Sequence, residues 1–135
     1  MQQAAATVGA VFGLLALVGF LPGLTAHMEE IGVAGERTTT LLFGVFAVSV
    51  LHNVIHVIYA VAGVVLAASA RTAKWYLIAG GAGHLLLALL GFVGAADWVP
   101  LNRPDGWLHL CLGAGMAGLG LLPAKPRVRA AAGRK

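Results

Sequence analysis

Charged residues are scarce in this chain: of its 135 residues, only 10% are Asp, Glu, Lys or Arg, whereas 59% are hydrophobic. A soluble domain of this size carries about 25% charged residues. The single cysteine, Cys111, excludes an intramolecular disulfide, and no thiol-redox motif surrounds it. No arginine-rich helical face with interleaved aromatic residues exists to hold a phosphate backbone, so nucleic acid is not an expected partner.

Four apolar stretches fill most of the chain instead, at residues 7–26, 40–68, 75–96 and 107–122. About 20 apolar residues of helix cross a bilayer core about 30 Å thick. Because lipid offers no hydrogen-bonding partner, a spanning segment satisfies its own backbone, as a helix does. The sequence therefore predicts an all-α fold, an integral membrane four-helix bundle in one domain, with the lipid bilayer as its surroundings and a basic tail at residues 123–135.

The charges indicate how such a bundle is oriented. When the helices are joined in order, seven of the nine basic residues share one side: Arg71, Lys74, Lys125, Arg127, Arg129, Arg134 and Lys135. The other side holds two basic residues and all five acids: Arg37, Arg103, Glu29, Glu30, Glu36, Asp97 and Asp105. The positive-inside rule then predicts a multi-pass protein with both termini in the cytoplasm. Aromatic residues are expected at the inner boundary (Trp75, Tyr76) and at the outer boundary (Trp98, Trp107).

Local signals suggest where the predicted helices begin. The hydroxyl groups of residues 38–40, all threonine, are expected to cap the second helix, and that of Thr72 the third. Pro104 and Asp105 suit the first turn of the fourth helix, because proline has no N–H to lose and a carboxylate complements the positive helix end.

Two parts of the sequence resemble each other. Residues 9–20 read GAVFGLLALVGF and residues 81–92 read GAGHLLLALLGF, with eight of twelve positions identical at an offset of 72. A weaker similarity links NVIHVI, around His56, with GWLHLC, around His109. The sequence therefore predicts a tandem parallel repeat of two helical hairpins. However, His56 lies about sixteen residues into the predicted second helix, whereas His109 lies near a helix start. Either the second helix projects beyond the outer surface or the second similarity is coincidental.

The candidate site consists of polar residues inside the predicted helices: Ser49, His52, Asn53, His56, Tyr59, His84 and His109. Four of them, from Ser49 to Tyr59, follow one another at steps of three, four and three, which places them on one stripe of a helix. Asp105, at the start of the fourth helix, is a further candidate. A polar side chain that faces lipid is costly, so these groups are expected to face the bundle interior or a partner.

The histidines have two main interpretations. A buried imidazole often bridges helices by hydrogen bonds without further function. Alternatively, two histidines on facing helices could ligate the iron of haem b, with His52 or His56 paired with His84 or His109. His52 and His56 also have the spacing of a zinc-protease motif, but Asn53 stands where that motif has its glutamate, and no intramembrane carboxylate offers a third ligand. No catalytic residue, no metal centre and no enzymatic activity are therefore expected.

Small residues recur at four-residue spacing: Gly9/Gly13, Gly19/Gly23, Gly113/Ala117 and Ala114/Gly118. Such faces let helix backbones approach closely in a membrane. They have two interpretations, packing inside the bundle or association with a membrane-protein partner or a second copy of the chain.

Three strings carry a family resemblance: LLFGVFAVSVLHNVIHVIYAVAGVVLA, LLLALLGFVG and PLNRPDGWLHLCLGAGMAGLG. Together they resemble a small four-helix bacterial membrane family, common in actinobacteria and catalogued as domain of unknown function 4383. The family often has Asp-Asn where this chain has Asp105 and Gly106. The resemblance implies a plasma-membrane location and four helices, and it brings no known activity, cofactor or catalytic residue.

The function predicted from the sequence is non-catalytic. We expect an accessory or scaffolding subunit, or a homo-oligomer, that acts through helix-face contacts. Two alternatives remain open: a small electron carrier that binds haem b through its histidines, and a component of a lipid or small-molecule transporter that uses the polar stripe.

Overall fold

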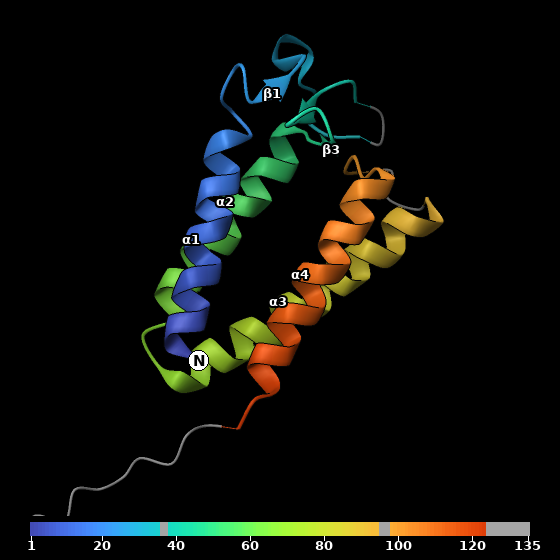
Figure 1. Cartoon of the computed structure of the whole chain (residues 1–135). Coiled ribbons are helices and arrows are strands. Elements are labelled where there is room, and N and C mark those ends of the chain that lie inside the picture. The colour runs from blue at the N-terminus through green and yellow to red at the C-terminus, as the bar shows by residue number, and fades with distance from the viewer. Residues whose placement is uncertain (36–37, 95–97, 124–135) are drawn as a thin grey trace, which may run out of the picture.

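Four helices dominate the computed structural model, which describes residues 1–35, 38–94 and 98–123 (Figure 1). They are α1 (Gln2–Val18), α2 (Val50–Leu66), α3 (Ala70–Val93) and α4 (Arg103–Leu121). α1 packs along α2 and α3 packs along α4, so the molecule consists of two helical hairpins. The N-terminus, the α2–α3 turn and the end of α4 lie at one end of the molecule (Figure 1). The predicted set of four helices is confirmed. Some residues of the charge pattern lie outside the described residues: Glu36, Arg37, Asp97 and the basic residues of the 123–135 tail.

Between α1 and α2 the chain forms a small antiparallel sheet at the opposite end of the molecule (Figure 1). Its strands β1 (Thr25–Ala26), β2 (Leu41–Leu42) and β3 (Phe46–Ala47) pair in that order, and a short 3₁₀ helix (Met28–Glu30) follows β1. The predicted first helix therefore ends early, and the first ten residues of the stretch 40–68 are not helical. Both boundaries were wrong because hydropathy alone does not distinguish a short apolar strand from a helix.

Side chains other than those predicted cap two of the helices. The Ser49 hydroxyl accepts a hydrogen bond from the His52 N–H at 3.2 Å and caps α2, and Ser69 caps α3 in the same way. The predicted caps at residues 38–40 and at Thr72 are therefore wrong. Asn102 and Asp105 form a reciprocal capping box at the start of α4, where Pro104 and Asp105 occupy the first turn as predicted.

Glycines let the helices of each hairpin touch. A Cβ atom added to Gly9 would lie 2.9 Å from the Ala60 carbonyl oxygen and 3.1 Å from the Gly63 Cα. A Cβ atom added to Gly81 would lie 2.6 Å from the Ala117 nitrogen. Any larger residue would push the helices apart, so these close approaches require glycine. The small-residue faces at Gly9 and Gly113 therefore pack inside the bundle.

Matching positions of the two hairpins play matching roles. Ser49 caps α2 and Asn102, 53 residues later, caps α4. His56 and His109 stand at the same separation, and both are buried. Because α2 begins at Val50, His56 lies in its second turn, as His109 does in α4. The mismatch in depth that the sequence suggested therefore disappears.

The apolar core occupies the half of the bundle near the N-terminus. It contains Ala5, Phe12, Ala73, Tyr76, Leu77 and Met116. The Gln2 side chain donates to the carbonyl oxygens of Ala67 and Ala68, both at 3.0 Å, and ties the start of α1 to the end of α2. The other half of the interior is polar and forms the candidate site.

Candidate functional site: a buried histidine cluster

Four histidines from three helices meet in the polar half of the interior. α2 contributes His52 and His56, whose ring centroids lie 4.7 Å apart. The His109 ring, from α4, lies 5.7 Å from that of His52 and 5.2 Å from that of His84, which comes from α3. All four are buried, with 1% to 7% of their surface exposed. We call these four residues the histidine cluster.

Phe12 of α1 closes the histidine cluster toward the apolar core. Its ring stacks on His84 with the centroids 5.0 Å apart and the planes 7° apart. It also lies 5.5 Å from the His56 ring and 5.0 Å from the Tyr59 ring. Each of the four helices thus contributes a ring to one group of packed aromatic and imidazole side chains.

The histidine cluster is short of hydrogen bonds. Five buried ring nitrogens have no partner among the described residues: His52 Nδ1, His56 Nδ1, both nitrogens of His84, and His109 Nε2. Buried polar atoms in folded proteins nearly always have a partner, and clustered exceptions call for an explanation such as a bound ion or water. The first interpretation of the sequence, in which the histidines bridge helices by hydrogen bonds, predicted more bonds than these rings make.

A hydrogen bond holds the orientation of the His109 ring. Its Nδ1 lies 2.8 Å from the carbonyl oxygen of Asp105, one turn earlier in α4. A carbonyl oxygen only accepts, so Nδ1 carries the proton and Nε2 is left with a free lone pair. This backbone contact therefore directs one basic nitrogen into the histidine cluster.

Asp105 itself joins α4 to the sheet. One of its carboxylate oxygens, Oδ2, accepts hydrogen bonds from the backbone N–H groups of Ala47, at 3.0 Å, and Asn102, at 2.9 Å. Burial raises the pKa of the Asp105 carboxyl from 3.8 to about 6, against the opposing effect of the two N–H donors. Asp105 precedes the apolar stretch 107–122 and lies in the first turn of α4. Asp105, a predicted site residue, therefore links α4 to the sheet beside the histidine cluster.

Two cavities adjoin the histidine cluster. One of about 10 Å³ is lined by all four histidines together with apolar side chains such as Ile55 and Val99. A second, of about 220 Å³, lies between the sheet and α4 and touches His52, His56 and His109. The smaller cavity has room for about one water-sized atom. Ligation of haem b by these histidines stays a prediction.

The remaining predicted site residues, Ser49, Asn53 and Tyr59, lie outside the histidine cluster. Ser49 caps α2, and Tyr59 is half-buried and contacts Phe12 and His84. Asn53 is fully buried against Gly19, and neither its amide oxygen nor its nitrogen has a partner within the described part of the chain. The sequence reasoning missed Phe12, which an apolar pattern does not distinguish from an ordinary core residue. Its alignment with His84 in the repeat was the signal that could have found it.

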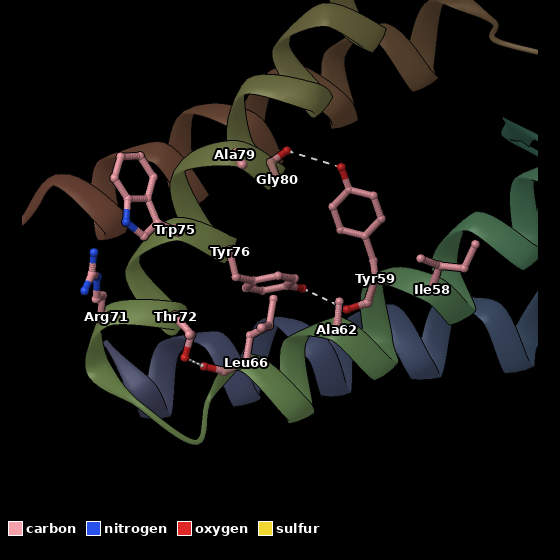
Figure 2. A pocket seen from close by; sticks show the side chains of 10 residues that line it. All are labelled: Ile58, Tyr59, Ala62, Leu66, Arg71, Thr72, Trp75, Tyr76, Ala79 and Gly80. Carbon is pink, nitrogen blue, oxygen red and sulfur yellow. Dashed lines mark hydrogen bonds between the residues drawn. The ribbon is translucent and has the colours of Figure 1, made fainter.

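A larger groove lies away from the histidine cluster, between α2 and α3 near their connecting turn (Figure 2). It has a volume of about 530 Å³ and mostly apolar walls, with Arg71 and Trp75 along one side (Figure 2). The Tyr76 hydroxyl donates to the Tyr59 carbonyl oxygen at 3.0 Å and fixes the floor of the groove.

An exposed group of potential metal ligands lies near the sheet. His27, Glu29 and Glu30 place one ligand atom each within 4.8 Å of one another. Exposed acidic groups of this kind are common, and no further observation points to a ligand there. The predicted acidic loop is thus present as a solvated surface.

Fold and site together define a small helical protein with two hairpins around a buried imidazole cluster. The chain belongs to the family described as domain of unknown function (DUF4383), whose family model matches residues 2–122. This confirms the family resemblance. No curated protein and no solved structure matches the chain.

Proposed function

We propose that the chain is a multi-pass membrane protein that acts through contacts of its helix faces, as an accessory subunit or as a homo-oligomer. One observation carries the membrane part of the proposal: apolar side chains point outward and polar ones inward. Large exposed hydrophobic residues occur on all four helices, for example Leu17, Val61, Leu86 and Leu121. Water does not favour this distribution, whereas lipid does.

The helix lengths support the same proposal. α3, with 24 residues, is long and apolar enough to cross a membrane, and α1 and α2 are shorter apolar helices. At about 1.5 Å per residue, helices of this length come close to the thickness of a bilayer core, about 30 Å. Arg71 and Lys74 lie at the end that holds the N-terminus, whereas Glu29 and Glu30 lie at the sheet end. The positive-inside rule then assigns the N-terminal end to the cytoplasm.

The likeness of the two hairpins supports a tandem repeat. The helix caps, the buried histidines and the glycine contacts recur at offsets of 72 and 53 residues. Two hairpins that run in the same direction are related by a pseudo-two-fold axis along the membrane normal. We infer that the fold arose by duplication of one hairpin.

The outer face of α4 supports association with another chain. Cβ atoms added to Gly115 and Gly118 would meet nothing within 4 Å, unlike those added to the internally packed glycines. Ala114 and Cys111 are exposed on the same side of the helix. This side is flat, and a second membrane helix could approach it closely.

Cysteine labelling tests the topology. In a Cys111→Ala background, Glu29→Cys should react with a membrane-impermeant maleimide in intact cells, and Lys74→Cys should react only after the membrane is opened. Labelling of both positions from one side, or extraction of the protein by carbonate without detergent, would contradict the proposal.

Crosslinking through the native Cys111 tests the association. In membranes, oxidation should give a dimer band that Cys111→Ala and Gly118→Leu abolish, while Val64→Leu, on the exposed side of α2, leaves it intact. If the partner is a different chain, that chain should co-purify in mild detergent and be lost in Gly118→Leu. A monomer without any partner would overturn this part of the proposal.

A second candidate function, binding of a lipid or small molecule as part of a transporter, is favoured by the groove of about 530 Å³ (Figure 2). The Arg71 guanidinium at its side suits an anionic headgroup, and the apolar walls suit an acyl chain. Native mass spectrometry should show bound anionic lipid that Arg71→Gln reduces and Arg103→Gln, at the far end of the bundle, does not.

A further inference from the structure

Most ring nitrogens of the histidine cluster have no hydrogen-bond partner among the described residues. Of the five unpartnered ring nitrogens, two belong to His84, which is 1% exposed. A neutral imidazole has one donor and one acceptor nitrogen, so each ring that lacks a partner loses a hydrogen bond it would make in water. Leaving a buried polar atom unpaired costs about 1–3 kcal/mol. Several such atoms in one place indicate that the folded protein holds something among them.

The shape of the interior restricts what that occupant is. The cavity that all four histidines line has a volume of about 10 Å³, which leaves space for a single small particle and excludes an organic molecule. Its other walls come from Ile55, Leu87, Trp98, Val99 and Leu101. None of these side chains is a metal ligand, so the histidines supply the ligand atoms. A water molecule or one metal ion meets these conditions.

The nitrogen ligands available in the cluster favour a metal ion over a water molecule. Imidazole nitrogen is a ligand that zinc, copper, nickel and iron accept. His52 and His56 stand four residues apart on one face of α2, a spacing at which two histidines can ligate the same ion. The Asp105 carbonyl oxygen holds the Nδ1–H of His109, which is the outer contact that orients a metal-binding histidine and leaves Nε2 free as a ligand.

We propose that the histidine cluster binds one divalent first-row transition-metal ion, with zinc or copper as the preferred class, through imidazole nitrogens of His52, His56, His84 and His109. Among the described residues, no three of these histidines place one ring nitrogen each within 4.8 Å of one another. Three pairs of these rings have centroids 4.7 to 5.7 Å apart, so binding requires the side chains to rotate until their nitrogens converge on one ion. The buried Asp105 carboxylate, one turn before His109, lines a cavity together with His52, His56 and His109 and supplies a negative charge there.

The metal content of the full chain tests this site. The protein is produced without a polyhistidine tag in medium supplemented with zinc, purified in detergent and analysed by mass spectrometry of its metals. We expect one equivalent of zinc per chain. Replacement by cobalt should give the intense visible absorption of a four-coordinate nitrogen-ligated Co²⁺ ion, a signal that a merely structural histidine does not produce.

Two substitutions remove ligands and one is a control. His84→Phe puts at position 84 the residue that the first hairpin carries at the matching position, Phe12, and His56→Gln is a second, smaller change. Both should lose the bound zinc and the cobalt absorption. His27→Gln, which breaks the exposed group near the sheet, should retain both.

Three results would overturn the proposal. The first is a purified protein with no metal above that of His84→Phe. The second is metal that is lost in His27→Gln and kept in His84→Phe and His56→Gln, which would place it at the surface group. The third is a Soret band in the absorption spectrum, which would make the histidines haem ligands. Circular dichroism and gel filtration identify any variant that fails to fold, and the conclusion then rests on the other variant of the pair.

Discussion

Phe12 and His84 lie face to face, with their ring planes 7° apart, at the point where the two hairpins meet. The two residues occupy equivalent positions in the similar strings 9–20 and 81–92. The proposed pseudo-two-fold axis between the hairpins would bring equivalent residues of α1 and α3 together in this way. One hairpin contributes a phenyl ring and the other an imidazole, so the two similar strings differ at this contact, beside the histidine cluster.

Phe12→Ala should destabilise the protein strongly. Phe12 is fully buried and contacts the rings of His56, Tyr59 and His84. Truncation of a buried phenylalanine costs about 3–5 kcal/mol. The unfolding midpoint in detergent should therefore fall well below that of Leu14→Ala, which removes an exposed side chain from the same helix. Equal midpoints would show that the two hairpins do not depend on this contact.

Gly81→Ala should separate α3 from α4, because the added Cβ would lie 2.6 Å from the backbone nitrogen of Ala117. Overpacking of this kind costs about 1–3 kcal/mol. Gly118→Ala is the matched control on α4, since its Cβ meets nothing within 4 Å. Thermal unfolding of the two variants in the same detergent should show a lower unfolding midpoint for Gly81→Ala only. A loss for Gly118→Ala of similar size would contradict the described packing of α4.

Asp105→Ala should loosen the sheet from α4. The substitution leaves the buried N–H of Ala47 without its acceptor, at a cost of about 1–3 kcal/mol. In the wild type, both backbone N–H groups bond to the same carboxylate oxygen of Asp105. Asp105→Asn keeps one side-chain oxygen that can accept both bonds, so this variant should lose less stability than Asp105→Ala. Hydrogen exchange at residues 41–47 provides the measurement. Equal protection in the two variants would show that the side-chain oxygen does not hold the sheet.

Stability should depend on pH through the same residue. The pKa of the Asp105 carboxyl is raised by burial to about 6, above its ordinary value of 3.8. Between these values the folded state binds more protons than the unfolded state, so stability falls as pH rises through this window and levels off above about 6. Asp105→Asn does not titrate, and its difference from the wild type in unfolding free energy should change across this window. A constant difference would mean that the carboxyl is not perturbed.

Several features follow from the sequence alone. The count and order of the helices come from four separate apolar stretches, the family follows from three strings between residues 41 and 120, and Pro104 and Asp105 mark a helix start. These features are local: each depends on residues close together in the chain, where composition and spacing act directly. Helical periodicity also predicted the stripe from Ser49 to Tyr59, in which Ser49, His52 and His56 are buried and Tyr59 is half-buried.

Other features depend on contacts between distant segments, which the local sequence pattern does not contain. Residues 41–42 and 46–47 form strands because β1, distant in the sequence, pairs with the first of them, and Ser49 therefore becomes a helix cap. That later helix start brings His56 level with His109 and assembles the histidine cluster from three helices. The stacking of Phe12 on His84 likewise depends on how two hairpins meet. Contacts between distant segments determine such positions, and only the folded chain brings those segments together.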